Sequence, residues 1–286
     1  MKFCKTWQTR PEILLMVMAA AMPIAFWAWV VLLNNFTVEV ASFTGKEIGI
    51  LQSLREVPGF LSFLVVYLLL IIAEQRLALL SLFILGVGVA LTGYFPTIIG
   101  LYITTVISSI GFHYYEACHQ SLSLQWLDKK TAPERMGLIY SVASVAKFLV
   151  LGAIFTVYLL SLPEISWHAL ASSTGLATGL NSYQFTYLFT GLVTCGLAVV
   201  AYTIFPQFNE TVQQTRRIIL RKRYWLYYAL TFISGARRQI FIVFASFLMV
   251  EKFGYSLTQI TALFLLNAAF NILLAPLVGK VISRVG

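Results

Sequence analysis

The feature that most constrains this chain is its succession of long apolar runs that contain no charged side chain. One run covers residues 13–33, and another covers residues 77–112, which is 36 residues without Asp, Glu, Lys or Arg. A helix needs about 20 apolar residues to cross the hydrocarbon layer of a membrane. Because a backbone in lipid must satisfy its own hydrogen bonds, such runs predict transmembrane α-helices. The first run continues well past residues 19–21, three alanines, which favours a membrane helix over a cleaved signal peptide.

Composition also favours a membrane protein over a water-soluble one. Of the 286 residues, 59% are hydrophobic and only 11% are charged, whereas soluble domains are roughly 45–50% apolar and about 25% charged. We therefore predict an all-α fold, a polytopic transmembrane helical bundle. With charges, proline and polar clusters taken as boundaries, the sequence predicts eight crossing helices, at about residues 12–34, 48–72, 77–94, 97–119, 137–160, 184–206, 224–249 and 256–278.

The basic residues are distributed unequally between the two predicted sides of the membrane. With the N-terminus in the cytoplasm, cytoplasmic segments hold 14 of the 20 Lys and Arg residues, external loops hold two, and the predicted spans hold four. This asymmetry is typical of the positive-inside rule and predicts a cytoplasmic N-terminus. The basic clusters lie between apolar runs and not along one solvated face, so we expect no nucleic-acid partner despite the net charge of +9.

The most basic segment, residues 207–223, follows the sixth predicted helix and divides the chain. We interpret residues 1–206 as an N-terminal six-helix bundle, residues 207–223 as a cytoplasmic linker, and residues 224–286 as the first two helices of an incomplete C-terminal bundle. A weak internal repeat supports two related halves. Glu39 and Glu251 share an offset of 212 residues, and two apolar positions that follow each of them share it too.

A short motif at the end of the chain carries a family resemblance. The segment from Gly279 to Gly286, Gly-Lys-Val-Ile-Ser-Arg-Val-Gly, resembles the cytoplasmic G-x-L-x-D-R-x-G loop motif of the major facilitator superfamily. Gly279, Arg284 and Gly286 fit that motif, while Ser283 replaces the usual acid. The first-half counterpart, residues 73–76, keeps an acid and a base but lacks the glycines. The resemblance implies that these loop residues contribute to gating contacts between helix ends.

The same resemblance implies a fold of twelve helices in two bundles. About eight of these helices are predicted in this chain, so we expect a transporter that is truncated after its eighth transmembrane helix.

Ionisable side chains within the predicted spans are the candidates for function, because a charge in hydrocarbon is costly and is retained for a purpose. The spans hold two acids and four bases, and the bases are Arg55, Lys147, Arg237 and Arg238. An excess of buried positive charge favours an anionic solute, and we predict that these four residues bind it. The alternative is that they form structural ion pairs between helices.

The two acids within the spans, Glu56 and Glu116, are the candidates for proton coupling, because a carboxyl group in an apolar site can take up a proton near neutral pH. His113 lies one helical turn before Glu116 and extends the predicted proton relay. His119 lies one turn after Glu116. A metal site formed by His113, Glu116 and His119 is therefore an alternative.

Tryptophans and asparagines within the predicted spans are also candidates for structural roles. Trp27 and Trp29 are interpreted as members of an aromatic belt at the membrane interface. Asn267 and Asn271 share one helix face, and both interhelical hydrogen bonding and solute contact are open for them.

Together these features predict a secondary active transporter that moves a small, anionic solute by alternating access, with protons as the candidate coupling ion. We expect neither an enzyme nor a cofactor, and the expected partners are the solute, protons and the lipid bilayer. The expected location is the plasma membrane, specifically a bacterial inner membrane. The alternatives are a membrane-embedded metalloenzyme and a non-transporting membrane receptor or assembly protein.

Overall fold

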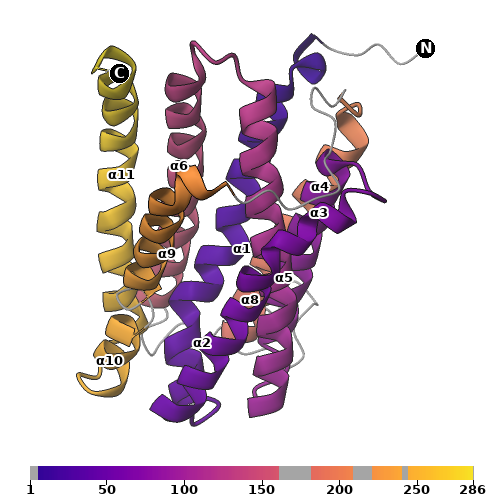
Figure 1. The fold of residues 1–286 in the computed structure, drawn as a ribbon. Helices are drawn as coiled ribbons and strands as arrows, with labels where there is room; N and C mark the ends of the chain where they lie inside the picture. The colour runs from indigo at the N-terminus through magenta and orange to yellow at the C-terminus, as the bar shows by residue number, and fades with distance from the viewer. Residues whose placement is uncertain (1–5, 161–181, 209–220, 240–243, 286) are drawn as a thin grey trace.

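A computed structural model describes residues 6–160, 182–208, 221–239 and 244–285, and these residues form helices and turns without any β-strand (Figure 1). Seven helical segments in this part of the chain are long and apolar enough to cross a membrane. They are α1 (Pro11–Glu39), α2 with α3 (Gly45–Leu68), α4 (Glu74–Thr92), α5 (Ile98–Trp126), α6 (Ala132–Leu160), α8 (Ser182–Ile204) and the first part of α11 (Leu257–Leu274). The predicted all-α, multi-pass membrane bundle is confirmed.

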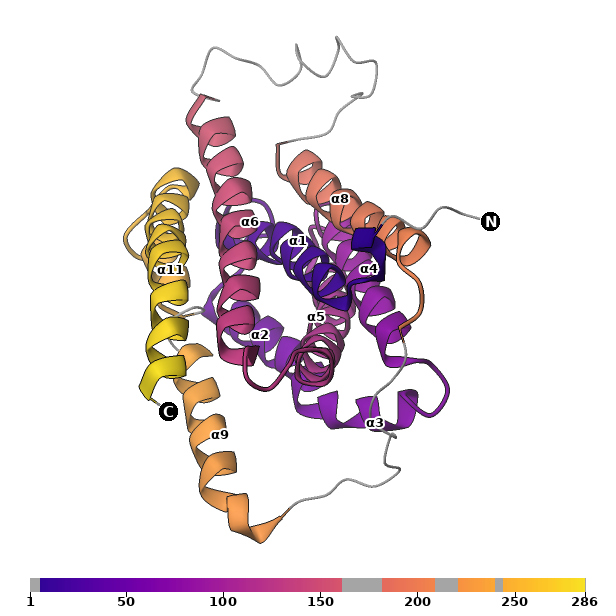
Figure 2. The same cartoon turned by 90° about the horizontal axis from the view of Figure 1, so that it is seen from above.

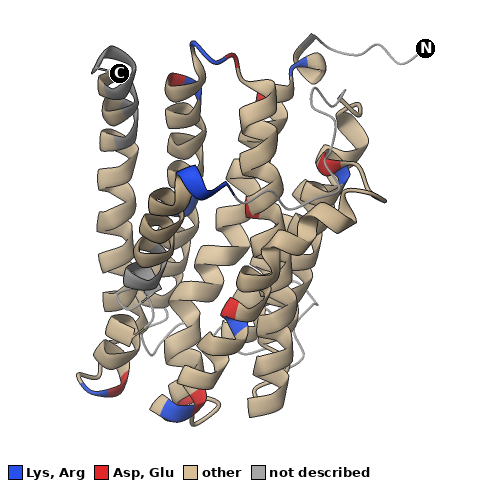
Figure 3. Cartoon of the chain, viewed as in Figure 1, with Lys and Arg blue, Asp and Glu red and all other residues tan. Residues whose placement is uncertain are grey.

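Helix α1 occupies the centre of the bundle. Seen from above, α4, α5, α6 and α8 pack around it, α2 lies against α5, and α11 lies against α6 (Figure 2). Its apolar side chains are accordingly buried, and Leu14, Met18 and Phe36 have no exposed surface. Most charged residues lie near the two ends of the helices, while a few lie at mid-height within the bundle (Figure 3).

Polar residues fix where several helices begin. Thr44 and Glu47 form a capping box at the start of α2, in which the Thr44 backbone N–H donates to Glu47 Oε2 at 2.9 Å. Thr97 Oγ1 accepts a hydrogen bond of 3.1 Å from the Gly100 backbone N–H at the start of α5. Pro11 begins α1, where its missing N–H has no helical partner to lose.

Close approach of backbones holds α4 against its two neighbours, α5 and α8. A Cβ added to Gly111 of α5 would lie 2.3 Å from the Leu85 backbone nitrogen of α4. A Cβ added to Gly191 of α8 would lie 2.4 Å from the Gly86 carbonyl oxygen of α4. Small residues permit such contacts between membrane helices, where the hydrophobic effect does not drive association.

One predicted helix differs from the structure, and another lies partly outside the described residues. The helix predicted at 48–72 is interrupted, because α2 (Gly45–Phe60) contains Pro58 and is followed by a 3-10 turn (Leu61–Leu64) and the short α3 (Val65–Leu68). The helix predicted at 224–249 stays a prediction, because residues 240–243 within it lie outside the described residues. Its described residues include α9 (Trp225–Gln239).

The end of the chain also differs from the prediction. Residues 240–243 lie outside the described residues, and α10 (Ser246–Glu251) follows them. Helix α11 (Leu257–Val285) then continues seven residues beyond its predicted end at residue 278. Its last turn lies at the same end of the bundle as the N-terminus (Figure 1).

Candidate functional site

A cavity of about 680 Å³ opens between α1, α2, α5, α6 and α11. This volume lies in the range of about 300–1,000 Å³ that is usual for sites that bind small molecules. Among the described residues, its Arg, Lys, His and Glu lining residues are Arg55, Glu56, His113, Glu116, His119 and Lys147. The structure therefore brings together five residues that were predicted in two roles and from three different spans: Arg55, Glu56, His113, Glu116 and Lys147.

The cavity lies near the middle of the helices that enclose it. Lys147 is one residue past the midpoint of α6, and Asn271 is the middle residue of α11. His113 is one residue past the midpoint of α5. Charged groups at this depth are far from either aqueous surface unless the cavity itself contains water.

Arg55 and Glu56, neighbours on α2, form an ion pair at the edge of the cavity. Arg55 Nη2 lies 2.7 Å from Glu56 Oε1, and Arg55 Nε donates to the same oxygen at 3.1 Å. The guanidinium carbon lies 5.8 Å from the centroid of the Trp29 ring. Both residues lie on α2, so this is an ion pair within one helix and not one between helices, and Glu56 offsets the charge of Arg55.

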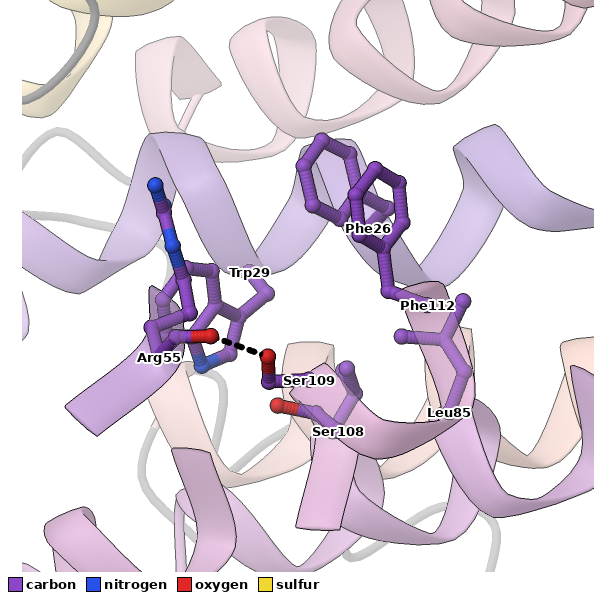
Figure 4. A pocket seen from close by; sticks show the side chains of 8 residues that line it. Phe26, Trp29, Arg55, Leu85, Ser108, Ser109 and Phe112 are labelled. Carbon is purple, nitrogen blue, oxygen red and sulfur yellow. Dashed lines mark hydrogen bonds between the residues drawn. The ribbon is translucent and has the colours of Figure 1, made fainter. Parts of the chain in front are cut away.

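The backbone of Arg55 is anchored to α5. The Ser109 hydroxyl donates to the Arg55 carbonyl oxygen, and the Arg55 side chain extends away from Ser108 and Ser109 (Figure 4). The residues drawn there surround a space of about 10 Å³ that borders the cavity, since Phe26, Arg55 and Phe112 line both. The Phe26 and Phe112 rings stack with their centroids 4.2 Å apart.

Lys147 is held by uncharged groups. Its Nζ donates to Asn267 Oδ1 at 3.0 Å and lies 3.5 Å from the centroid of the Trp27 ring and 5.8 Å from that of Phe264. Only 6% of the residue is exposed. Within the described part of the chain, no carboxylate forms an ion pair with it. Lys147 thus brings a positive charge to the cavity wall that only a cation–π contact and an amide oxygen offset.

The α5 residues do not form the metal site that their spacing allowed. His119 Nε2 lies 3.1 Å from the Leu15 carbonyl oxygen of α1, and the His119 ring packs against Tyr115. The His113 ring instead faces Gly59 of α2, where an added Cβ would lie 2.7 Å from His113 Cε1. Among the described residues, no group of three His, Cys, Asp or Glu side chains could hold a metal ion.

The other predicted site residues lie wholly or partly outside the residues that the structure describes. The backbone of Arg237 and Arg238 belongs to α9, but their side chains are not among those described. The predicted gating loop is wrong as a loop, because Gly279 and Arg284 lie within α11, which continues to Val285. Their side-chain positions and Gly286 are likewise outside the described part.

The sequence did not identify Trp27 as a cavity residue, nor did it decide the role of Asn267. The belt interpretation of Trp27 and Trp29 is wrong, because Trp27 lines the cavity and Trp29 is only 3% exposed. One signal was available for Asn267, since an amide inside a span needs a hydrogen-bonding partner. That signal does not name the partner, because Lys147 and three arginines all lie within the predicted spans.

Two other polar clusters tie helix ends together away from the cavity. At one end, Gln125 Nε2 donates to the buried Glu74 Oε2 at 2.7 Å, and Gln75 Nε2 donates to the Pro206 carbonyl at 3.0 Å. At the other, the Tyr183 hydroxyl donates to Glu39 Oε2 at 2.7 Å. Glu74 and Gln75 of the motif segment and Glu39 of the repeat therefore fix helix ends in this structure.

Comparisons with known proteins leave the resemblance to the major facilitator superfamily as a prediction. No protein-family model matches the chain, and no curated protein matches it.

Proposed function

We propose that the protein is a secondary transporter that moves a small, anionic solute across the membrane by alternating access. The observation that carries this proposal is the cavity of about 680 Å³ at mid-depth, to whose wall the described residues contribute six Arg, Lys, His and Glu side chains. Charges are costly at this depth, and a cavity that concentrates them is the usual place for a transported solute.

The arrangement of the cavity wall supports movement as well as binding. Four of its helices, α1, α2, α5 and α6, precede residues 207–223, whereas α11 follows them. In transporters of two bundles, the solute site lies between the bundles, and rocking of one against the other exposes it to each side in turn. A change in the contact between α6 and α11 would open or close this cavity.

The charges of the wall support an anion. Arg55 is paired with Glu56, whereas Lys147 has only uncharged neighbours among the described residues. An anion beside Lys147 would supply the missing counter-charge. Glu116, Glu56 and His113 line the same cavity and are the groups through which we propose that protons are coupled.

The proposed location is a bacterial inner membrane with the N-terminus in the cytoplasm. The support for this orientation is the 14 to two distribution of basic residues between the two sides of the predicted topology.

Flux measurements in proteoliposomes test the proposal. We expect the purified protein to catalyse saturable uptake of labelled organic anions, and we expect a pH gradient to drive accumulation. Liposomes without protein provide the background. A protein that is folded by gel filtration and thermal unfolding, but moves no organic anion with or without the gradient, would contradict a transport function.

A further inference from the structure

Two hydrogen-bond donors converge on one oxygen atom in the cavity wall. Lys147 Nζ donates to Asn267 Oδ1 at 3.0 Å, and Asn271 Nδ2 donates to the same oxygen at 3.2 Å. The two asparagines lie one turn apart on α11, and Lys147 reaches them from α6. An ammonium and an amide N–H that meet at one oxygen provide the contacts that a carboxylate oxygen accepts.

We propose that this point is the carboxylate-binding subsite of the cavity. In the loaded protein, one carboxylate oxygen of the solute occupies the place of Asn267 Oδ1 and accepts from Lys147 Nζ and Asn271 Nδ2. This inference rests on the transport function proposed above and names its class of solute. When the cavity is empty, Asn267 Oδ1 accepts the hydrogen bonds that the solute would accept, and this contact with Lys147 joins α6 to α11.

The charge at the subsite selects a solute with a single negative charge. Lys147 is 6% exposed and contacts an amide and two aromatic rings, so in the described part of the chain its own charge is the one that contacts this point. A monocarboxylate neutralises this charge. A dicarboxylate or phosphate dianion would leave a second negative charge in an apolar wall, which costs free energy.

The surroundings of the subsite select the rest of the solute. Trp27 and Phe264 flank Lys147 with their ring centroids 5.5 Å apart, and the stacked Phe26 and Phe112 line the same cavity. Aromatic walls favour a flat, apolar body that can pack against ring faces and edges. The solute class is therefore an aromatic monocarboxylate, with benzoate as its simplest probe.

Binding of radiolabelled benzoate to the full chain in lipid nanodiscs, measured by equilibrium dialysis, tests the subsite. We expect saturable binding that neither phosphate, succinate nor the uncharged benzyl alcohol displaces. Loss of a hydrogen bond to a charged group weakens binding by about tenfold to a hundredfold, so Asn271→Ala and Lys147→Gln should fall in that range. Lys129→Gln, an exposed lysine in the loop after α5, is the matched control and should bind as the unaltered protein does.

Further variants and a parallel flux assay separate the possible outcomes. Asn271→Asp keeps the size of the side chain and places a carboxylate where the solute is proposed to bind, so benzoate binding should disappear while gel filtration and thermal unfolding stay unchanged. Benzoate binding without flux in proteoliposomes would retain the subsite and overturn the transport function. Flux of other anions, with no benzoate binding or with equal displacement by phosphate, would overturn the subsite alone.

Discussion

The α4–α5–α8 side of the bundle and its α6–α11 side are built differently. On the first side, the glycines at 111 and 191 let backbones approach so closely that an added Cβ would lie 2.3–2.4 Å from a backbone atom. On the second, α6 meets α11 beside a cavity, and a Cβ added to Gly152 of α6 would be 4.0 Å from Leu265 Cδ2. Interlocked backbones resist sliding, whereas contacts made by side chains can rearrange. We infer that the first side is the scaffold and that the second side moves.

The largest effect is expected at Glu116, an acid that the scaffold side presents to the cavity. Glu116→Gln removes the titratable group but keeps the shape of the side chain. We expect it to abolish accumulation of anion driven by a pH gradient while exchange of labelled for unlabelled anion continues. Proteoliposome uptake with and without the gradient measures both activities, and accumulation that persists in the variant would remove Glu116 from the coupling mechanism.

The next effect distinguishes function from stability on the moving side. Lys147→Met keeps a long apolar stem beside Trp27 but removes the charge. We expect anion uptake to fall by about a hundredfold, because a hydrogen bond to a charged group is lost. The thermal unfolding temperature should not fall, since replacing a buried charge by an apolar group of similar volume is often neutral or stabilising.

The exposed Lys130 provides the control for Lys147→Met. Lys130→Met should change neither uptake nor unfolding temperature. Lys147→Met could instead lower the unfolding temperature by as much as a substitution of Gly111 or Gly191 does. That result would contradict the proposed difference, because the α6–α11 side would then contribute as much stability as the α4–α5–α8 side.

The helices of these two sides were predictable from the sequence where they depend on a continuous segment of the chain. The spans of α1 and α4 followed from uncharged runs, because crossing a membrane is a property of a continuous segment. The interruption near Pro58 was missed, although proline in a helix removes a backbone hydrogen bond. Helix α5 extends to Trp126, beyond its predicted end at 119, because polar residues are compatible with helix once the chain leaves the lipid.

The candidate site was predicted in its charges but not in its contacts. Burial cost alone selected Lys147 and Glu116, which line the same cavity. The partner of Lys147 was not predictable, because Asn267 lies 120 positions away and no local pattern records that pairing. The excess of bases over acids in the spans did not show which positive charges lack a counter-charge, because the charge of Arg55 is already paired with that of Glu56.

The third prediction makes the same substitution on the two sides. Gly111→Ala forces α4 and α5 apart and should destabilise the protein by about 1–3 kcal/mol, the usual cost of overpacking. Gly152→Ala has space at 4.0 Å, and alanine favours a helix over glycine by about 1 kcal/mol. We therefore expect a lower unfolding temperature for the first variant and an equal or higher one for the second. Equal losses in both variants would contradict the difference in packing between the two sides.

The smallest expected effect concerns two tryptophans of α1 that face different sides. The Trp27 ring lies under Lys147 of α6, whereas the buried Trp29 lies beside Arg55 of α2. Trp27→Leu removes a cation–π contact worth about 0.5–2 kcal/mol, so anion affinity should weaken by about threefold to thirtyfold while the unfolding temperature changes little. Trp29→Leu should show the opposite, since Trp29 lines a small space with Leu85 of α4 and Ser109 of α5, and the smaller side chain leaves a void on the scaffold side. If both variants lose affinity and stability in the same proportion, α1 does not separate the two sides.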